Sequence, residues 1–326
     1  MRPVPQSTYG RSPWLAGLFL ALLAESAFAS PSPKELLALG RADDAVQILQ
    51  QQIVQSPGDA ESNNLLCRAY FMLEEWDRGI AACERARNLD PQNSLYHLWL
   101  GRVYGEKADH AGFLAAAGLA KKVRIAFERA VELDPKSSEA RTDLAEFYLE
   151  APGIVGGGKD KARAQGDALM PLNPGMAHWV AARIAEKEKD SASAEREYRA
   201  AVTASHSSAR TCLDLAGFLR RANRLDEMEQ VLGKLESAPL DHAPALMDGA
   251  GMLLRTGRNL PLAVRLLHRY LSFPVEEGPA FRAHDLLGQI LEKQGEGPAA
   301  AVQYRAALAL NHTYTRAQED LRRVDR

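Results

Sequence analysis

The stretch Gly153–Asp160, with the sequence GIVGGGKD, could bind phosphate. It fits the pattern G-x-x-x-x-G-K-[ST] at seven of eight positions. In such a loop, backbone N–H groups cradle phosphates, the Lys reaches the outer phosphate oxygens, and the Ser or Thr hydroxyl holds Mg²⁺. Asp160 replaces that hydroxyl and would place a carboxylate beside the phosphates. The motif alone leaves nucleotide or phosphate binding by Gly153–Lys159 open.

The residues around this loop favour a structural role instead. A phosphate loop follows a buried β-strand, but here Leu144, Phe147 and Tyr148 recur at helical spacing, without runs of Val and Ile. Pro152 would end such a helix, and glycines allow the positive φ angles that a reversal needs. We therefore expect a loop between two helices, with Asp160 at the start of the second, where an acid is favourable.

Other reactive residue types form no recognisable constellation in the sequence. The eight histidines are spread along the chain, and no two have the i, i+4 spacing of a helical zinc site. There is no G-x-S-x-G motif, and paired carboxylates such as Glu74 and Glu75 are expected on solvated helix ends. We therefore predict that the protein is not an enzyme and has no catalytic residues, metal or cofactor.

The N-terminus has the pattern of a secretory signal peptide. Arg2 and Arg11 precede an eleven-residue apolar run, Trp14–Ala24, which is too short to span a bilayer. The sequence Ala27-Phe28-Ala29 then fits an A-x-A cleavage site. We predict a signal peptide over residues 1–29 and a periplasmic or secreted product with no integral membrane segment after cleavage. The alternative is an uncleaved membrane anchor.

The composition is that of a globular chain without a nucleic-acid signature. The 326 residues are 46% hydrophobic and 25% charged, with a net charge of −2, which is sufficient for a sizeable core. No basic stripe is interleaved with aromatic residues, so no nucleic-acid partner is predicted.

Past the N-terminus, the chain is periodic. Pro57, Pro91, Pro135 and Pro174 each follow an apolar segment of helical period, at intervals of 34, 44 and 39 residues. Ala, Leu, Arg and Glu dominate, and β-branched runs are absent. The pattern indicates a repeated helical unit of 34 residues with insertions in the third and fourth units.

Small and aromatic residues recur at fixed places in these units. In one unit they are Leu66, Cys67, Tyr70, Gly79, Cys83, Ala86 and Pro91, and in the last full unit Leu287, Gly288, Leu291, Ala300, Tyr304 and Ala307. This pattern resembles the tetratricopeptide repeat family, and exported bacterial members in particular. The resemblance implies an all-α, right-handed α-solenoid of stacked helix-turn-helix pairs. We expect roughly eight units over residues 30–312, the first degenerate, and a C-terminal capping helix over 313–326.

Cys67 and Cys83 fall on the facing sides of the two helices of one unit. An odd number of cysteines in an exported protein suggests one disulfide and one free thiol, which would then be Cys212. Two interpretations remain open for the pair: a disulfide, or two small buried thiols of the core.

The first helix of each unit lines the concave face in the tetratricopeptide family. The repeat register places Arg68, Arg102 and Arg183 at one inward position, with Asn64 and Trp179 one turn earlier. Guanidinium groups can grip carboxylates in a bidentate manner, and an indole ring can cover an apolar side chain. The alternative is that the arginines pair within the chain with three glutamates of the fourth unit, Glu139, Glu146 and Glu150.

These observations predict a protein-protein interaction scaffold of the cell envelope. It would bind a peptide or protein partner in its concave groove through Asn64, Arg68, Arg102, Trp179 and Arg183. The alternative function is nucleotide or phosphate binding through Gly153–Lys159.

Overall fold

The computed structural model describes residues 31–274 and 279–325, so the predicted signal peptide lies outside the described residues. This part of the chain contains α-helices and short 3₁₀ helices and no β-strand, which confirms the all-α solenoid. The helices are α1 Pro33–Ala38, α2 Ala42–Gln55, α3 Ala60–Met72, α4 Trp76–Leu89, α5 Ser94–Asp109, α6 Phe113–Leu133, α7 Ser138–Glu150, η1 Gly153–Val155, α8 Lys159–Leu169, α9 Pro174–Lys187, α10 Ser191–Ala204, α11 Ala209–Arg221, α12 Leu225–Gly233, η2 Lys234–Glu236, α13 Pro244–Thr256, α14 Leu260–Leu271, α15 Ala280–Lys293, α16 Gly297–Leu310 and α17 Thr315–Val324.

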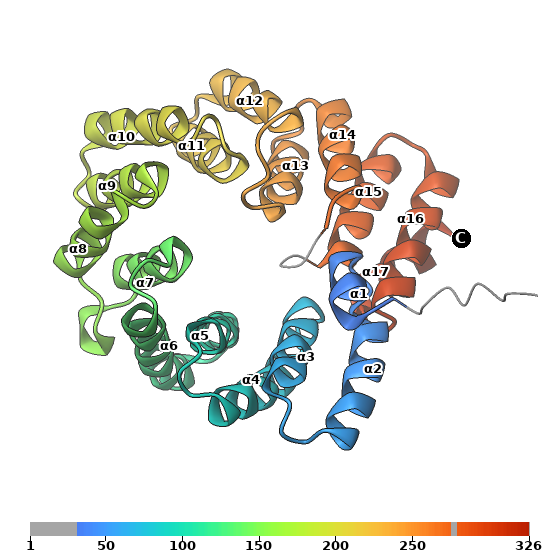
Figure 1. Cartoon of the computed structure of the whole chain (residues 1–326). Coiled ribbons are helices and arrows are strands. Elements are labelled where there is room, and N and C mark those ends of the chain that lie inside the picture. Colours follow the sequence, from blue (N-terminus) through green and yellow to red (C-terminus); the bar gives the residue numbers. More distant parts are fainter. Residues whose placement is uncertain (1–30, 275–278, 326) are drawn as a thin grey trace, which may run out of the picture. The chain divides into compact units, whose positions relative to one another are not determined.

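Helices α1 to α16 pack as consecutive pairs, and α17 packs against α16. The even-numbered helices lie on the outer side of the row, and α3, α5, α7, α9, α11 and α13 lie on its inner side (Figure 1). We call the surface formed by these odd-numbered helices the inner face. Because each pair buries its apolar side against the next, one core runs from α1 to α15, and a second, small cluster of Phe281, Ala307 and Ala317 lies between α15, α16 and α17.

The prolines that mark the sequence period lie at helix boundaries. Helices α2, α4 and α6 end two residues before Pro57, Pro91 and Pro135, and Pro174 is the first residue of α9. Proline has no N–H to continue a helix, but it fits the first turn, where that N–H has no helical partner. The period is therefore a consequence of local backbone chemistry.

Two glycines at matching places in the third and last units allow close packing within helix pairs. A Cβ atom on Gly101 of α5 would lie 2.4 Å from the Phe127 ring of α6, and one on Gly288 of α15 would lie 2.5 Å from the Tyr304 ring of α16. These distances are far below van der Waals contact, so the aromatic rings occupy the space that a larger side chain would need.

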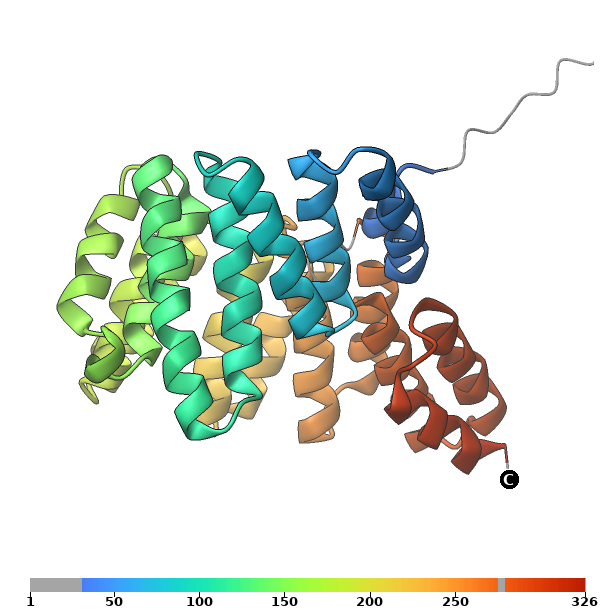
Figure 2. The same ribbon diagram turned by 90° about the horizontal axis from the view of Figure 1, so that it is seen from below.

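One ion pair and one histidine–aspartate contact join the first helix pairs to the last. Arg282 Nε of α15 lies 2.5 Å from Glu74 Oε1, just after α3. His312 Nδ1, between α16 and α17, lies 3.0 Å from Asp43 Oδ2 of α2. Figures 1 and 2 both show α1 and α2 next to the C-terminal helices. The row of helix pairs therefore curves until its two ends meet.

The extra residues of the third unit lengthen its helices. Helices α5 and α6 have 16 and 21 residues, and Phe113 and Leu114 at the start of α6 are largely exposed.

In residues 31–274 and 279–325, no helix is both long and apolar enough to cross a membrane.

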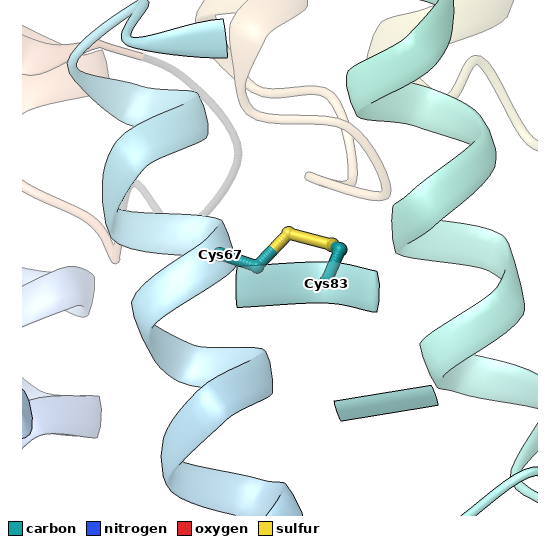
Figure 3. Close-up of a disulfide and its surroundings, with 2 residues drawn as sticks. All are labelled: Cys67 and Cys83. Carbon is teal, nitrogen blue, oxygen red and sulfur yellow. A yellow bond between two sulfur atoms is a disulfide. The ribbon is translucent and has the colours of Figure 1, made fainter. Parts of the chain in front are cut away.

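A disulfide joins the two helices of the second pair. Cys67 of α3 and Cys83 of α4 are bonded through their sulfur atoms, with Cα atoms 5.1 Å apart (Figure 3). Of the two interpretations left open by the sequence, the structure contains the disulfide. Cys212 is a buried free thiol, and burial raises its pKa to about 11, which disfavours the reactive thiolate.

Candidate interaction surface

In the glycine loop between α7 and α8, backbone N–H groups donate hydrogen bonds within the chain. In a phosphate cradle, successive N–H groups would point toward the anion. Here three successive glycines donate to backbone carbonyls instead: Gly156 to Gly153 (3.0 Å), Gly157 to Pro152 (3.2 Å) and Gly158 to Tyr148 (2.8 Å). The loop is therefore a folded connection between helices, and its geometry does not favour the phosphate-binding alternative.

The other residues of the loop also have structural roles. Lys159 Nζ lies 2.9 Å from Glu188 Oε1, and this bond holds the pKa of Glu188 below its ordinary value. Gly156 has a φ of +102°, and a Cβ atom on Gly157 would lie 1.8 Å from the Ala151 carbonyl oxygen. Only glycine fits such a reversal, which accounts for the phosphate-loop likeness without a ligand.

Helix α7 carries a stripe of four acidic residues on the inner face. They follow the 4-3-4 spacing of one helix side: Glu139, Asp143, Glu146 and Glu150. The three glutamate side chains are 50%, 45% and 49% exposed, so solvent reaches the stripe. Each acid contacts an arginine from another inner helix, and these contacts join α5, α7, α9 and α11.

Arg102 and Arg183, which the sequence predicted to grip ligand carboxylates, are paired within the chain. Arg102 of α5 lies 2.6 Å from Glu139 and 2.7 Å from Asp143. Arg183 of α9 bonds Glu150, and Lys187 lies 3.0 Å from the same carboxylate. The intramolecular alternative therefore holds for both arginines, because the α7 stripe has carboxylates level with each guanidinium group along the helix axis.

Two buried tryptophans each have a pair of guanidinium groups against the ring. The Cζ atoms of Arg68 and Arg102 are 5.0 and 4.9 Å from the centre of Trp99. The Cζ atoms of Arg183 and Arg210 are 5.4 and 5.5 Å from the centre of Trp179. In each set, one arginine follows the tryptophan on its own helix and the other comes from an adjacent inner helix, so the ring and the cations brace neighbouring repeats.

Two predicted groove residues are not surface residues. Trp179 is 1% exposed and Asn64 is 3% exposed. Trp179 therefore cannot cover a ligand side chain as predicted, because the arginines and the core enclose its ring. A position one helical turn before the inward arginine points into the joint between repeats, not out of the inner face. Arg68 remains partly exposed beside Trp99.

The sequence prediction missed Arg210 and Asp214 of α11. Arg210 Nη2 lies 3.4 Å from Glu146 Oε2, and burial raises the pKa of Asp214 against the opposing effect of Arg210. Arg210 and Asp214 are four residues apart at the start of α11, so the sequence places them on one side of that helix. They were missed because the repeat pattern of this unit is weak and did not show which of its positions face inward.

The described residues contain no group of three or more His, Cys, Asp or Glu side chains that could hold a metal ion. Asp285 of α15 is a buried carboxyl at the contact with α17, and burial raises its pKa to about 6. It lies beside Arg316 and accepts a hydrogen bond from the Tyr314 hydroxyl (3.3 Å) in the C-terminal packing.

The stacked helix pairs place the described chain in the class of helical-repeat solenoids. Residues 36–102 match the family described as "Tetratricopeptide repeat". These residues therefore belong to the tetratricopeptide repeat family, and the described chain has the fold of its solenoids.

Solved structures of that fold are similar to the chain at low identity. Yeast Tom70 is 15% identical with a TM-score of 0.53, over 96% of this chain and 66% of its own. The tetratricopeptide protein TTC0263 of Thermus thermophilus is 18% identical with a TM-score of 0.47, over 57% of this chain and 97% of its own. No curated protein sequence matches the chain significantly. The similarity concerns the fold alone.

Proposed function

We propose that this protein is a non-enzymatic interaction scaffold that binds an extended peptide or a protein segment along its inner face. The observation that carries this proposal is the acidic stripe of α7, which is partly exposed to solvent. Arginines of α5, α9 and α11 contact its carboxylates. A helical repeat needs apolar and small residues to stack, not a row of charges on one side. Partly exposed charge pairs can exchange their partners for those of a ligand at small cost.

The proposal includes export to the cell envelope, as a periplasmic or secreted protein. It rests on the apolar run and A-x-A site in residues 1–29. The Cys67–Cys83 disulfide supports it, because disulfides persist in oxidising compartments and are rare in the cytosol. Cell fractionation with a cytosolic marker tests the location independently of binding.

Site-specific photo-crosslinking in the native envelope tests the binding surface. A photoreactive amino acid replaces Glu139 on the inner face or, as the matched control, the exposed Lys121 on outer helix α6. We expect a discrete crosslinked partner from position 139 and none from position 121. Equal capture at both positions, or capture at 121 alone, contradicts binding on the inner face.

A further inference from the structure

A cleft with both polar and apolar lining lies on the outer side of the second and third helix pairs. Residues of the outer helices α4 and α6 and of the inner helix α5 line it, and we call it the outer cleft (Figure 1). Its volume is about 460 Å³, which is within the range of small-molecule sites. Leu100 of α5 and Ile125 of α6 give it apolar surface, and Ile125 is 59% exposed. Such a surface can cover the hydrocarbon part of a ligand.

His97 of α5 presents a hydrogen-bond acceptor to the outer cleft. The residue lines the cleft but is only 8% exposed, and its Nε2 atom donates a hydrogen bond to the Pro91 carbonyl oxygen at 3.0 Å. Burial lowers the pKa of His97, which keeps the ring neutral near neutral pH. The lone pair of a neutral ring with its proton on Nε2 lies on Nδ1.

This Nδ1 atom has no hydrogen-bond partner within residues 31–274 and 279–325. It is also not one of the fully enclosed unpartnered atoms of that part of the chain, so it is open to the cleft that His97 lines. Largely buried polar atoms in native proteins normally have a partner, from the protein, from water or from a ligand. A ligand in the outer cleft can therefore donate a hydrogen bond to His97.

Arg87 of α4 presents donors to the same cleft. It is partly buried, its Nε donates to Asn88 Oδ1 at 3.0 Å, and it makes no ion pair with any described residue. Arg129 of α6, in contrast, lies 3.0 Å from the Glu132 carboxylate. A guanidinium group can bind a carboxylate through two parallel hydrogen bonds. Arg87 is therefore available to hold an anionic group of a ligand.

The acidic residues of the outer cleft already have donors. Three glutamates line it, and each accepts a hydrogen bond from the chain: Glu84 from the Tyr104 hydroxyl, Glu128 from the Tyr148 hydroxyl and Glu132 from Arg129. Lys122 lies 5.0 Å from the centre of the Tyr104 ring and, like Arg87, has no ion pair in the described ranges. An anionic ligand therefore does not have to displace a carboxylate from either cation.

We propose that the outer cleft binds a small aliphatic carboxylate that has a hydroxyl or N–H group beside the carboxylate. Arg87 binds the carboxylate, His97 Nδ1 accepts the hydrogen bond of the neighbouring donor, and Leu100 and Ile125 cover the aliphatic part. A ligand with only one of the two polar groups leaves either the cation or the acceptor without a partner, which lowers its affinity. The site lies on the outer side of the helix row and does not depend on partner binding at the inner face.

Calorimetric titration of the full chain, purified from an exporting host, tests the ligand class. The probe is α-hydroxyisocaproate. Its methyl ether, α-methoxyisocaproate, keeps the charge but lacks the donor, and its amide, α-hydroxyisocaproamide, keeps the donor but lacks the charge. We expect saturable binding of the hydroxy acid and an affinity about tenfold or more lower for each analogue.

The C-terminal residue of a peptide presents the same two groups and is a second source of this chemistry. Acetyl-Gly-Gly-Leu with a free carboxylate is therefore titrated beside the hydroxy acid. Tighter or equal binding assigns the outer cleft to chain ends, and weaker binding assigns it to small free acids. Both outcomes support the proposed combination of carboxylate and donor.

The ring nitrogens of His97 give a local readout. In the chain labelled with ¹⁵N-histidine, a hydrogen bond to Nδ1 should shift the resonance of that nitrogen while Nε2 keeps its proton. The His97→Gln variant assigns the resonance. We expect the shift with the hydroxy acid and not with its methyl ether, and equal shifts with both would contradict the role of the donor.

A matched pair of arginine variants on α4 tests the anion contact. Arg87→Gln should lower the affinity for the hydroxy acid by about tenfold or more. Arg85→Gln is the control, because Arg85 is exposed, reaches toward the Pro57 carbonyl (3.5 Å) and does not line the outer cleft. Circular dichroism checks that both variants fold, which we expect because neither arginine makes an ion pair in the described chain.

Four results overturn the proposal. They are the absence of saturable binding of the hydroxy acid, equal affinity for the hydroxy acid and its amide, equal affinity for the hydroxy acid and its methyl ether, and unchanged affinity in Arg87→Gln. The analogues are compared on the wild-type chain, so the result does not depend on whether His97→Gln folds.

Discussion

Two glycines one turn apart on α5 should respond in opposite ways to the same substitution. A Cβ atom on Gly101 would lie 2.4 Å from the Phe127 ring, whereas one on Gly105 would meet nothing within 4 Å. Both residues lie inside the helix Ser94–Asp109, so both gain the same intrinsic helix propensity, about 1 kcal/mol, when changed to Ala. Any difference between the variants must come from packing.

The packing cost at Gly101 should exceed the propensity gain. Carbon atoms pack at about 3.5–4.0 Å, so the Phe127 ring must move by about 1 Å to admit the methyl group. Phe127 is itself buried between α5 and α6, and overpacking of such a core costs about 1–3 kcal/mol. We therefore expect Gly101→Ala to lower the free energy of unfolding by about 0–2 kcal/mol, and Gly105→Ala to raise it by about 0.5–1 kcal/mol.

Urea denaturation, followed by tryptophan fluorescence, measures both changes. Trp99 lies on the same helix and reports its unfolding. A repeat array can unfold in more than one step, so circular dichroism is recorded in parallel and the midpoints are compared. If Gly101→Ala is as stable as Gly105→Ala, the close contact with Phe127 does not limit the packing of this repeat, and the reasoning is refuted.

Four further outcomes are expected. Reduction of the Cys67–Cys83 disulfide, which spans 16 residues, should lower the free energy of unfolding by roughly 3 kcal/mol, and non-reducing peptide mapping that finds two free thiols would contradict the bond. Lys159→Ala should change stability by less than about 0.5 kcal/mol, and a wild-type ATP or GTP affinity that this variant loses would restore the phosphate hypothesis. Burial raises the pKa of Asp285 to about 6, so the folded state binds this proton more tightly than the unfolded state does. The free energy of unfolding should therefore fall as the pH rises from about 4 to about 6. Asp285→Asn should remove this contribution to the pH dependence of the urea midpoint across the same range. Intact-mass analysis of the exported protein should give Ser30 as the first residue, and retention of residues 1–29 would contradict signal cleavage.

The sequence by itself determined the helices and their pairing. Proline positions, helical apolar spacing and the placing of small residues opposite aromatics act within one unit, as Gly101 with Phe127 and Gly288 with Tyr304 show. The helical residues before the Gly153–Asp160 loop also favoured a structural connection over a phosphate site. These features are readable because each depends on neighbours within about one repeat of the chain.

Only the tertiary structure decided the chemistry of the inner face. The repeat register predicted the inward positions of Arg102 and Arg183, but their partners belong to α7, which is more than thirty residues away along the chain in each case. Whether an arginine meets a carboxylate or solvent depends on the rotation and height of the next helix pair, and the sequence pattern does not specify these. The same rotation buries Trp179 and brings Glu146 beside Arg210, which is 64 residues away in sequence. Charge pairing between repeats is therefore a property of their stacking.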